Sequence, residues 1–226
     1  RVLVVAGSDS GGGAGIQADI KAITALGAYA ATAITALTAQ NTLGVQGVLP
    51  VPPAFLRRQV ESVLTDLGAD TVKTGMLGDA ETVALVADLL EEFAPGVPLV
   101  LDPVMVAKGG ARLLDEGAVD ALRRRLVPRA ALVTPNVPEA EALTGLEIAD
   151  LDAMRRAADA VLAQGAAAVL LKGGHMPGPV VRDVLAGPDG AEVLERPRLE
   201  TRHTHGTGCT LAAAVTAGLA AARRAD

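Results

Sequence analysis

The sequence predicts an α/β protein with three layers (α/β/α), in which a mostly parallel central sheet lies between two layers of helices. Short β-branched runs alternate with Ala- and Leu-rich stretches of helical period along the whole chain. The turn sequence Gly187-Pro188-Asp189-Gly190 separates two further β-branched runs and predicts an antiparallel edge hairpin. Because no repeat or linker divides the chain, we expect one domain over residues 1–226.

The strands follow from runs of β-branched and aliphatic residues, bounded by glycine, proline or polar residues. They are expected at 2–6, 30–38, 45–50, 71–74, 99–101, 131–134, 168–172, 180–185 and 191–195. The last two form the hairpin, and the others belong to the parallel part of the sheet.

The helices follow from the Ala- and Leu-rich stretches between these runs, at 14–26, 53–68, 80–92, 116–126, 138–144, 151–164 and 207–223. Asp79 precedes the third helix, where an aspartate side chain caps free N–H groups. Gly68 and Gly165 stand where the second and sixth helices stop, since glycine readily adopts the left-handed conformation that ends a helix.

Composition excludes several classes of function. The 226 residues are 50% hydrophobic, carry a net charge of −6 and include only three aromatic side chains. This argues against a nucleic-acid partner, which would require a basic face or a stacking platform. The apolar runs are shorter than the roughly 20 residues of a membrane helix. A single cysteine and the lack of a secretory signal pattern lead us to expect a cytoplasmic protein without a membrane partner.

Polar and glycine residues follow nearly every predicted parallel strand. In open parallel sheets, ligands bind outside the carboxyl ends of the strands, so these positions predict the site. The segments are 7–15, 39–41, 75–77, 102–104, 135–136 and 173–175.

The first of these segments is a glycine loop, Gly7-Ser8-Asp9-Ser10-Gly11-Gly12-Gly13-Ala14-Gly15. It has neither the spacing of a dinucleotide fingerprint nor the Gly-Lys pair of a P-loop. Glycine allows the backbone to approach a ligand closely, and it equally suits a tight turn between a strand and a helix. The loop alone leaves both interpretations open.

The strongest single signal is Thr204-His205-Gly206-Thr207-Gly208-Cys209-Thr210, at the start of the last helix. Free backbone N–H groups at such a helix start form an anion hole suited to a phosphoryl group. The helix dipole predicts a lowered pKa for the Cys209 thiol. The alternative is that Cys209 is a small buried hydrophobic residue.

Two constellations raise the question of a metal. His203, His205 and Cys209 do not form a recognised zinc spacing, so we do not expect zinc. Asn136 and Glu139 lie three residues apart around a helix start, where both can face the hydration shell of one magnesium ion. The same spacing also forms a capping box, and the pattern alone does not separate the two interpretations.

Together these motifs resemble the hydroxymethylpyrimidine/phosphomethylpyrimidine kinases of thiamine biosynthesis, within the ribokinase-like superfamily. The resemblance covers essentially the whole chain, because the motifs follow one another in order. They are Ala6-Gly7-Ser8-Asp9-Ser10, the segment 12–19, the segment 35–42, Lys73-Thr74-Gly75-Met76-Leu77, Leu101-Asp102-Pro103-Val104-Met105, Thr134-Pro135-Asn136, Leu171-Lys172-Gly173-Gly174-His175 and the segment 204–210.

The resemblance implies a ribokinase-like fold and ATP-dependent phosphorylation of 4-amino-5-hydroxymethyl-2-methylpyrimidine, then of its monophosphate. It assigns Gln40 to reading the pyrimidine, since an amide matches the 4-amino group and the adjacent ring nitrogen. The other implied substrate-binding residues are Asp19, Gly7, Ala14, Met76 and Val104.

The resemblance also implies the phosphoryl-transfer residues. Cys209 is the implied base, although a loose transition state depends more on charge neutralisation by the Gly206 and Gly208 loop than on deprotonation. Lys172, Thr207 and Asp102 are assigned to the nucleotide phosphates, and Asn136 and Glu139 to Mg²⁺ through water. The expected cofactors are ATP and Mg²⁺, and the expected assembly is a homodimer.

Two alternatives remain at this point. A pyridoxal-type vitamin kinase would share the fold and the cysteine-bearing loop. A binding module without turnover is disfavoured by the intact set of Asn136, Glu139, Lys172 and residues 206–209. Family members usually continue beyond the position of Asp226, so the C-terminal end of the domain is expected to be incomplete. The proline-rich loop Met176-Pro177-Gly178-Pro179 is a second departure from the family pattern.

Overall fold

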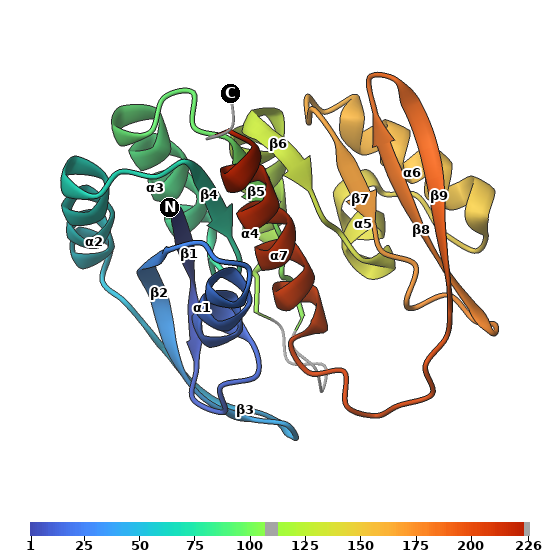
Figure 1. The fold of residues 1–226 in the computed structure, drawn as a ribbon, viewed down its shortest axis with the longest axis horizontal. Coiled ribbons are helices and arrows are strands. Elements are labelled where there is room, and N and C mark those ends of the chain that lie inside the picture. The colour runs from blue at the N-terminus through green and yellow to red at the C-terminus, as the bar shows by residue number, and fades with distance from the viewer. Residues whose placement is uncertain (107–112, 224–226) are drawn as a thin grey trace.

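The computed structural model describes residues 1–106 and 113–223. The strands are β1 (Val2–Asp9), β2 (Ala30–Asn41), β3 (Gly44–Pro50), β4 (Thr71–Thr74), β5 (Leu99–Leu101), β6 (Ala130–Val133), β7 (Val169–Leu171), β8 (Val180–Gly187) and β9 (Gly190–Pro197). The helices are α1 (Gly15–Ala25), α2 (Pro53–Asp66), α3 (Ala80–Phe93), α4 (Glu116–Ala121), α5 (Val137–Thr144), α6 (Leu151–Leu162) and α7 (Thr207–Ala222). Figure 1 shows their arrangement.

The described strands form one sheet in the order β3-β2-β1-β4-β5-β6-β7-β8-β9. The six strands from β2 to β7 in this order are parallel, which confirms the predicted fold class. The predicted hairpin is also confirmed, because β8 and β9 pair antiparallel and close at Gly187 opposite Gly190.

The other edge of the sheet differs from the prediction. The strand expected at 45–50 was assigned to the parallel part, but β3 turns back after Asn41 and pairs antiparallel with β2. Pairing with β3 extends β2 through Asn41, beyond the predicted end at residue 38. A two-residue connection between strands permits only a hairpin, because a parallel partner requires a crossover.

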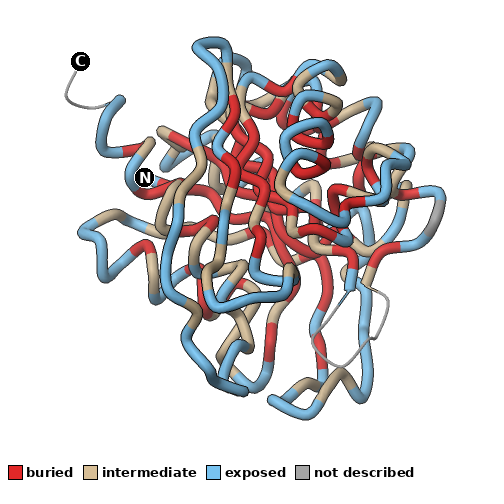
Figure 2. The backbone as a smooth tube through the Cα atoms, turned by 90° about the vertical axis from the view of Figure 1, so that its right-hand side faces the viewer, coloured by how far each residue is buried: buried red, intermediate tan, exposed pale blue. Residues whose placement is uncertain are grey.

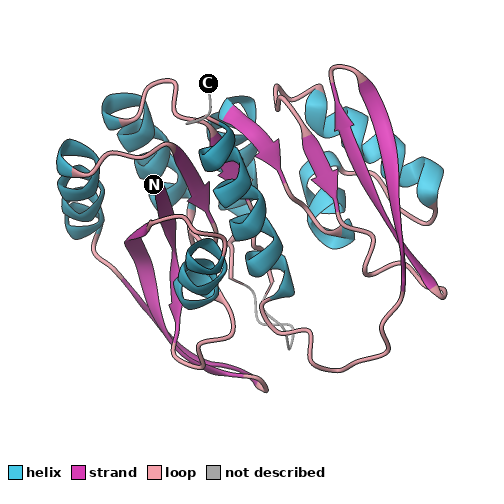
Figure 3. Ribbon diagram, viewed as in Figure 1, coloured by secondary structure: helices cyan, strands magenta, loops and turns pink. Residues whose placement is uncertain are grey.

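Helices cover both faces of the sheet (Figure 3), with α1 and α7 on one face and α2 to α6 on the other. Alternate residues of β1 serve the two layers. Val2 and Val4 pack toward α1 and α7, while Leu3 and Val5 join the larger core on the opposite face. Figure 2 shows the buried residues concentrated along the central strands, as expected when a parallel sheet is covered on both sides.

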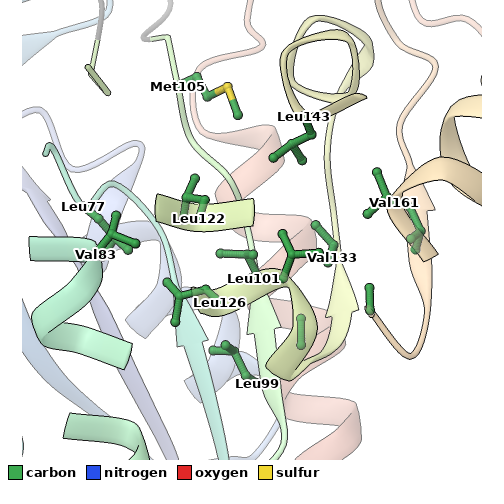
Figure 4. Packing of buried hydrophobic residues seen from close by; sticks show 14 of the residues in the cluster. Leu77, Val83, Leu99, Leu101, Met105, Leu122, Leu126, Val133, Leu143 and Val161 are labelled. Carbon is green, nitrogen blue, oxygen red and sulfur yellow. The ribbon is translucent and has the colours of Figure 1, made fainter. Parts of the chain in front are cut away.

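The larger core continues between the central strands and α3, α4, α5 and α6. Figure 4 shows Leu99 and Leu101 of β5 near Leu126 and Val133, and all four side chains are fully buried. Close packing at this level holds the strand ends in place, so the loops that follow them start from fixed positions.

The helix termini agree with most of the sequence signals. The Asp79 side chain accepts a hydrogen bond from the Thr82 amide at 2.7 Å, and Gly68 and Gly165 adopt positive φ angles of 66° and 106°. The helix expected at 116–126 differs, because α4 ends at Ala121 and continues as a π-helical turn over Leu122–Leu126. Pro128 follows, and its missing N–H interrupts the regular hydrogen-bond pattern. Within the described residues, no helix is long and apolar enough to cross a membrane.

Candidate active site

Two adjoining cavities lie at the carboxyl ends of the parallel strands. The smaller, of about 50 Å³, is lined by residues that include Gly7, Ala14, Gln40, Met76, Val104 and Cys209. The larger, of about 870 Å³, is lined by residues that include Asp102, Asn136, Glu139, Lys172, Gly206, Thr207 and Gly208. Ala14, Gln40, Val104 and Cys209 line both. The structure therefore brings every predicted site residue except Asp19 to one continuous pair of cavities.

Asp9 shapes the glycine loop between β1 and α1. Its buried carboxylate accepts hydrogen bonds from the backbone N–H groups of Gly11, Gly13 and Ala14 at 2.8, 3.1 and 2.8 Å. Burial raises the pKa of Asp9, but hydrogen bonds from His205 and these amides bring it below its ordinary value. Sequence reasoning did not select Asp9, although an acid inside a glycine loop is a signal for this role.

Gly15 begins α1 and requires glycine for two reasons. Its φ angle is 54°, and a Cβ at this position would lie 2.4 Å from the Gly7 carbonyl oxygen. The glycine loop is therefore both a tight turn and a wall of the smaller cavity. The two interpretations that the sequence left open, a tight turn and a backbone close to a ligand, are therefore compatible with each other.

Gln40 is fixed at the end of β2 by its backbone. Its N–H donates to Ser10 Oγ at 2.8 Å, and its carbonyl accepts from the same hydroxyl at 2.9 Å. The Gln40 side-chain oxygen accepts from Thr38 Oγ1 at 3.1 Å. Gln40 lines both cavities, and its amide offers a donor and an acceptor there.

Met76 forms the apolar wall of the smaller cavity. A Cβ on Gly7 would lie 2.7 Å from Met76 Cε, so the thioether occupies the space that glycine leaves. Met76 is buried, and Thr35 Oγ1 donates to its carbonyl oxygen at 2.7 Å. A flexible thioether adapts to the shape of a flat apolar ring.

Lys73 on β4 was not selected as a site residue, and it is fully buried beneath the smaller cavity. Its Nζ lies 3.0 Å from Asp19 Oδ2 and 3.9 Å from Asp102 Oδ2. Burial lowers the pKa of Lys73, but the charges of Asp19, Cys209 and Asp102 raise it above its ordinary value. The available signal was the scarcity of lysine, with one of four lysines inside a short predicted strand, Thr71–Thr74.

Asp19 is the predicted site residue that lines neither cavity. Its side chain on α1 is fully buried and contacts Lys73. Burial raises the pKa of Asp19 to about 6, against the opposing effect of the Lys73 charge. The structure therefore places Asp19 in contact with Lys73 and outside the residues that line the two cavities, and the substrate-binding role that the resemblance implies for it stays a prediction.

Lys172 and Asp102 form a second ion pair, in the larger cavity. Lys172 Nζ lies 3.2 Å from Asp102 Oδ1, which also accepts from Thr134 Oγ1 at 3.2 Å. Burial lowers the pKa of Lys172, but Asp102 and Glu139 raise it above its ordinary value. Among the described residues, the buried Asp102 Oδ2 has no hydrogen-bond partner, and Lys73 Nζ lies 3.9 Å from it. A buried oxygen without a hydrogen bond can accept one from a bound ligand or water.

Asn136 and Glu139 form the capping box of α5. The Glu139 amide donates to Asn136 Oδ1 at 3.0 Å, and the Asn136 amide donates to Glu139 Oε2 at 2.8 Å. Burial, together with the charge of Asp102, raises the pKa of Glu139 to about 7. Both side chains also line the larger cavity, so the capping role leaves the ligand role possible.

The start of α7 lies where the two cavities meet. Gly206 precedes the helix with a φ angle of 77°, and no side chain of the described residues caps the first turn. The Thr207 amide donates to the Thr204 carbonyl at 3.4 Å, so anion binding at this helix start falls to the amides that follow, beginning with Gly208. The predicted lowered pKa of Cys209 is wrong. Burial raises its pKa to about 11 and outweighs the opposing charge of Lys73.

The chain matches the phosphomethylpyrimidine kinase family over residues 9–226. The chain belongs to this family. A hydroxymethylpyrimidine/phosphomethylpyrimidine kinase of Streptomyces coelicolor is 52% identical over 97% of this chain and 80% of its own length. The thiamine biosynthesis bifunctional protein ThiED of Geobacter sulfurreducens is 53% identical over 97% of this chain, which spans 44% of that larger protein.

Solved structures of family relatives confirm the ribokinase-like fold. The phosphomethylpyrimidine kinase of Clostridium difficile superimposes with a TM-score of 0.86 at 40% identity, covering 97% of this chain and 90% of its own. The pyridoxal kinase of Bacillus subtilis, solved with ADP, superimposes with a TM-score of 0.89 at 40% identity, covering 97% and 84%. The solved structures similar to this chain therefore include both a phosphomethylpyrimidine kinase and a pyridoxal kinase.

Proposed function

We propose that the protein is a phosphotransferase of thiamine biosynthesis that uses ATP to phosphorylate 4-amino-5-hydroxymethyl-2-methylpyrimidine and then its monophosphate. Family membership over nearly the whole chain supports this function, since relatives about 50% identical are hydroxymethylpyrimidine/phosphomethylpyrimidine kinases. The observation that carries the proposal is the meeting of two cavities at the uncapped start of α7.

The smaller cavity has the chemistry to hold the pyrimidine. Gln40 offers an amide donor and acceptor to the 4-amino group and ring nitrogen, while Met76 and Val104 face the ring as apolar walls. Gly7 and Ala14 leave room for it. The hydroxymethyl group then points toward Cys209, which lines both cavities.

The larger cavity has the chemistry to hold the ATP phosphates. Gly206, Thr207 and Gly208 line this cavity at the helix start, where fixed backbone dipoles stabilise a transferring phosphoryl group. Lys172 supplies a positive charge beside them, held by Asp102. Because burial keeps the Cys209 thiol protonated at neutral pH, positioning and charge neutralisation carry more of the catalysis than a free thiolate.

A magnesium ion fits the acidic side of the larger cavity. Asp102 and Glu139 provide carboxylate oxygens, and the buried Asp102 Oδ2 has no hydrogen-bond partner in the part of the chain that the structure describes. No group of three or more His, Cys, Asp or Glu side chains converges on one point within the described residues. A hydrated ion suits this donor set, with Asn136, Glu139 and Asp102 contacting its water shell. When bound with ATP, magnesium neutralises phosphate charge.

The experiment that tests this function measures phosphate transfer from ATP to the free alcohol and to its monophosphate, separately, with pyridoxal in parallel. Pyridoxal is included because relatives of known structure are pyridoxal kinases. We expect transfer to both pyrimidines. Preference for pyridoxal would identify a pyridoxal-type kinase, and binding without ATP consumption would indicate a binding module.

We also propose that two copies of the chain form a homodimer. The hairpin of β2 and β3 exposes Leu37, Leu43, Val48 and Leu49. Exposed apolar side chains concentrated on one sheet edge are typical of an interface between subunits. Light scattering after size exclusion should give twice the chain mass, and a monomer mass at micromolar concentration would contradict the assignment.

A further inference from the structure

A buried hydrogen bond joins two loops that are 196 residues apart in the sequence. His205 Nε2 lies 2.8 Å from Asp9 Oδ2, and the two side chains are only 10% and 2% exposed. The same Asp9 carboxylate shapes the glycine loop through the amides of Gly11, Gly13 and Ala14. His205 therefore connects the segment before α7 to the acid that organises the loop before α1.

The backbones of the two loops also interlock. A Cβ on Gly206 would lie 1.7 Å from the Gly13 carbonyl oxygen, and a Cβ on Gly13 would lie 2.5 Å from His205 Cδ2. Only glycine at both positions allows this approach, because either methyl group would overlap neighbouring atoms. The hydrogen bond therefore lies in a tightly packed contact between the loop before α1 and the segment before α7. A small displacement of one would move the other.

Each end of the connection belongs to a different cavity. Asp9 lines the smaller cavity, where the pyrimidine is proposed to bind, whereas His205 lines the larger cavity beside Gly206. We propose that His205 is a positioning residue that, through Asp9, sets the distance between the acceptor hydroxyl and the phosphate-binding start of α7. This inference rests on the proposed kinase function.

The expected effect is on turnover rather than on the binding of either substrate alone. Phosphoryl transfer requires the two reactants in line, and a displacement of about 1 Å costs about 10²-fold in rate. Each substrate alone binds in its own cavity, and its affinity does not depend on the distance between the hydroxyl and the phosphate. Loss of the hydrogen bond should therefore lower kcat about 100-fold while the separate dissociation constants change less than threefold.

The test compares His205→Leu, which removes the donor, with His205→Gln, whose amide N–H can take the place of Nε2. The matched control is His203→Leu, because His203 is exposed two residues away. For each variant, kcat, both KM values, the melting temperature and the separate affinities for pyrimidine and for a non-hydrolysable ATP analogue are measured. We expect the kcat of His205→Gln to be at least tenfold higher than that of His205→Leu. The control should have the kcat of the wild type.

Three results would overturn the proposal. The first is a His205→Leu kcat equal to that of the control. The second is a loss confined to ATP affinity, which would make His205 a direct nucleotide contact. The third is a loss that follows melting temperature without rescue by glutamine, which would make the pair structural only. If His205→Leu does not fold, His205→Asn, which is too short to reach Asp9, replaces it. A wild-type protein that transfers no phosphate would instead overturn the proposed function and this role with it.

Discussion

Replacement of Glu139 by glutamine should separate the stability of the protein from its activity. The Glu139 carboxylate is buried, and burial followed by the charge of Asp102 raises its pKa from 4.5 to about 7. Glutamine keeps an oxygen to accept the Asn136 amide, so the capping box is preserved while the charge is removed. We expect Glu139→Gln to lower turnover and raise the magnesium requirement, because a neutral amide attracts a hydrated cation less.

The stability effect follows from the direction of the pKa shift. Between pH 4.5 and about 7 the native protein keeps a proton on Glu139 that the unfolded chain has released, so native stability falls as pH rises through this window. Each unit of pKa difference corresponds to about 1.4 kcal/mol, and the full difference therefore costs the wild type about 3 kcal/mol at pH 8. Glutamine has no such cost. At about 2–4 °C per kcal/mol, the variant should melt roughly 6–12 °C above wild type at pH 8.

Thermal unfolding without nucleotide, followed from pH 5 to pH 8, measures this difference. The gap between variant and wild type should be small at pH 5 and grow as Glu139 ionises in the native state. Glu147→Gln, at an exposed position shortly after α5, controls for the removal of one negative charge. The reasoning is refuted if the gap does not change with pH, or if Glu139→Gln is the less stable protein at pH 8.

Three further predictions follow from the site. Gln40→Ala should raise the KM for the pyrimidine about 10- to 100-fold in steady-state kinetics, with little change in the KM for ATP. A raised KM for ATP with an unchanged KM for the pyrimidine would mean that the two cavities hold the opposite substrates. Alkylation of Cys209 should be slow at neutral pH and accelerate toward pH 11, because the thiol is protonated below its raised pKa, and bound pyrimidine should block it. Fast labelling at pH 7 would contradict the raised pKa. Lys73→Met should lower the free energy of unfolding by about 3–5 kcal/mol in chemical denaturation, because it removes the partner of the buried Asp19 carboxylate. Adding Asp19→Asn should recover much of this loss. Equal stability of the single and double variants would contradict the importance of the ion pair.

Local patterns were sufficient for most of the architecture. The alternation of β-branched and helical stretches predicted the parallel sheet, and Asp79, Gly68 and Gly165 predicted helix ends that the structure shows. These features depend on neighbouring residues, so a single sequence contains the information. The motifs after the strands also predicted the site, because the carboxyl ends of parallel strands meet at one edge of the sheet.

The direction of β3 and the break in α4 required more than local pattern. A β-branched run at 45–50 is compatible with either strand direction, and the antiparallel one follows only once β2 is known to extend to Asn41, which leaves a two-residue connection. The helix expected at 116–126 has a regular apolar period, yet Pro128 beyond its end alters the last turns. In both cases the residues just outside the predicted element, rather than the pattern within it, decide the outcome.

The electrostatics of the site were decided by tertiary structure alone. A helix start predicts a lowered pKa for Cys209, but burial among folded elements raises it, since removal of water penalises the charged form more than the helix dipole favours it. Asp19 and Lys73 are 54 residues apart, and Asp9 and His205 are 196 apart. The sequence identified the chemical groups after each strand. Long-range packing decides which of these groups are desolvated and which form an ion pair or a hydrogen bond, because both depend on residues far apart in the sequence.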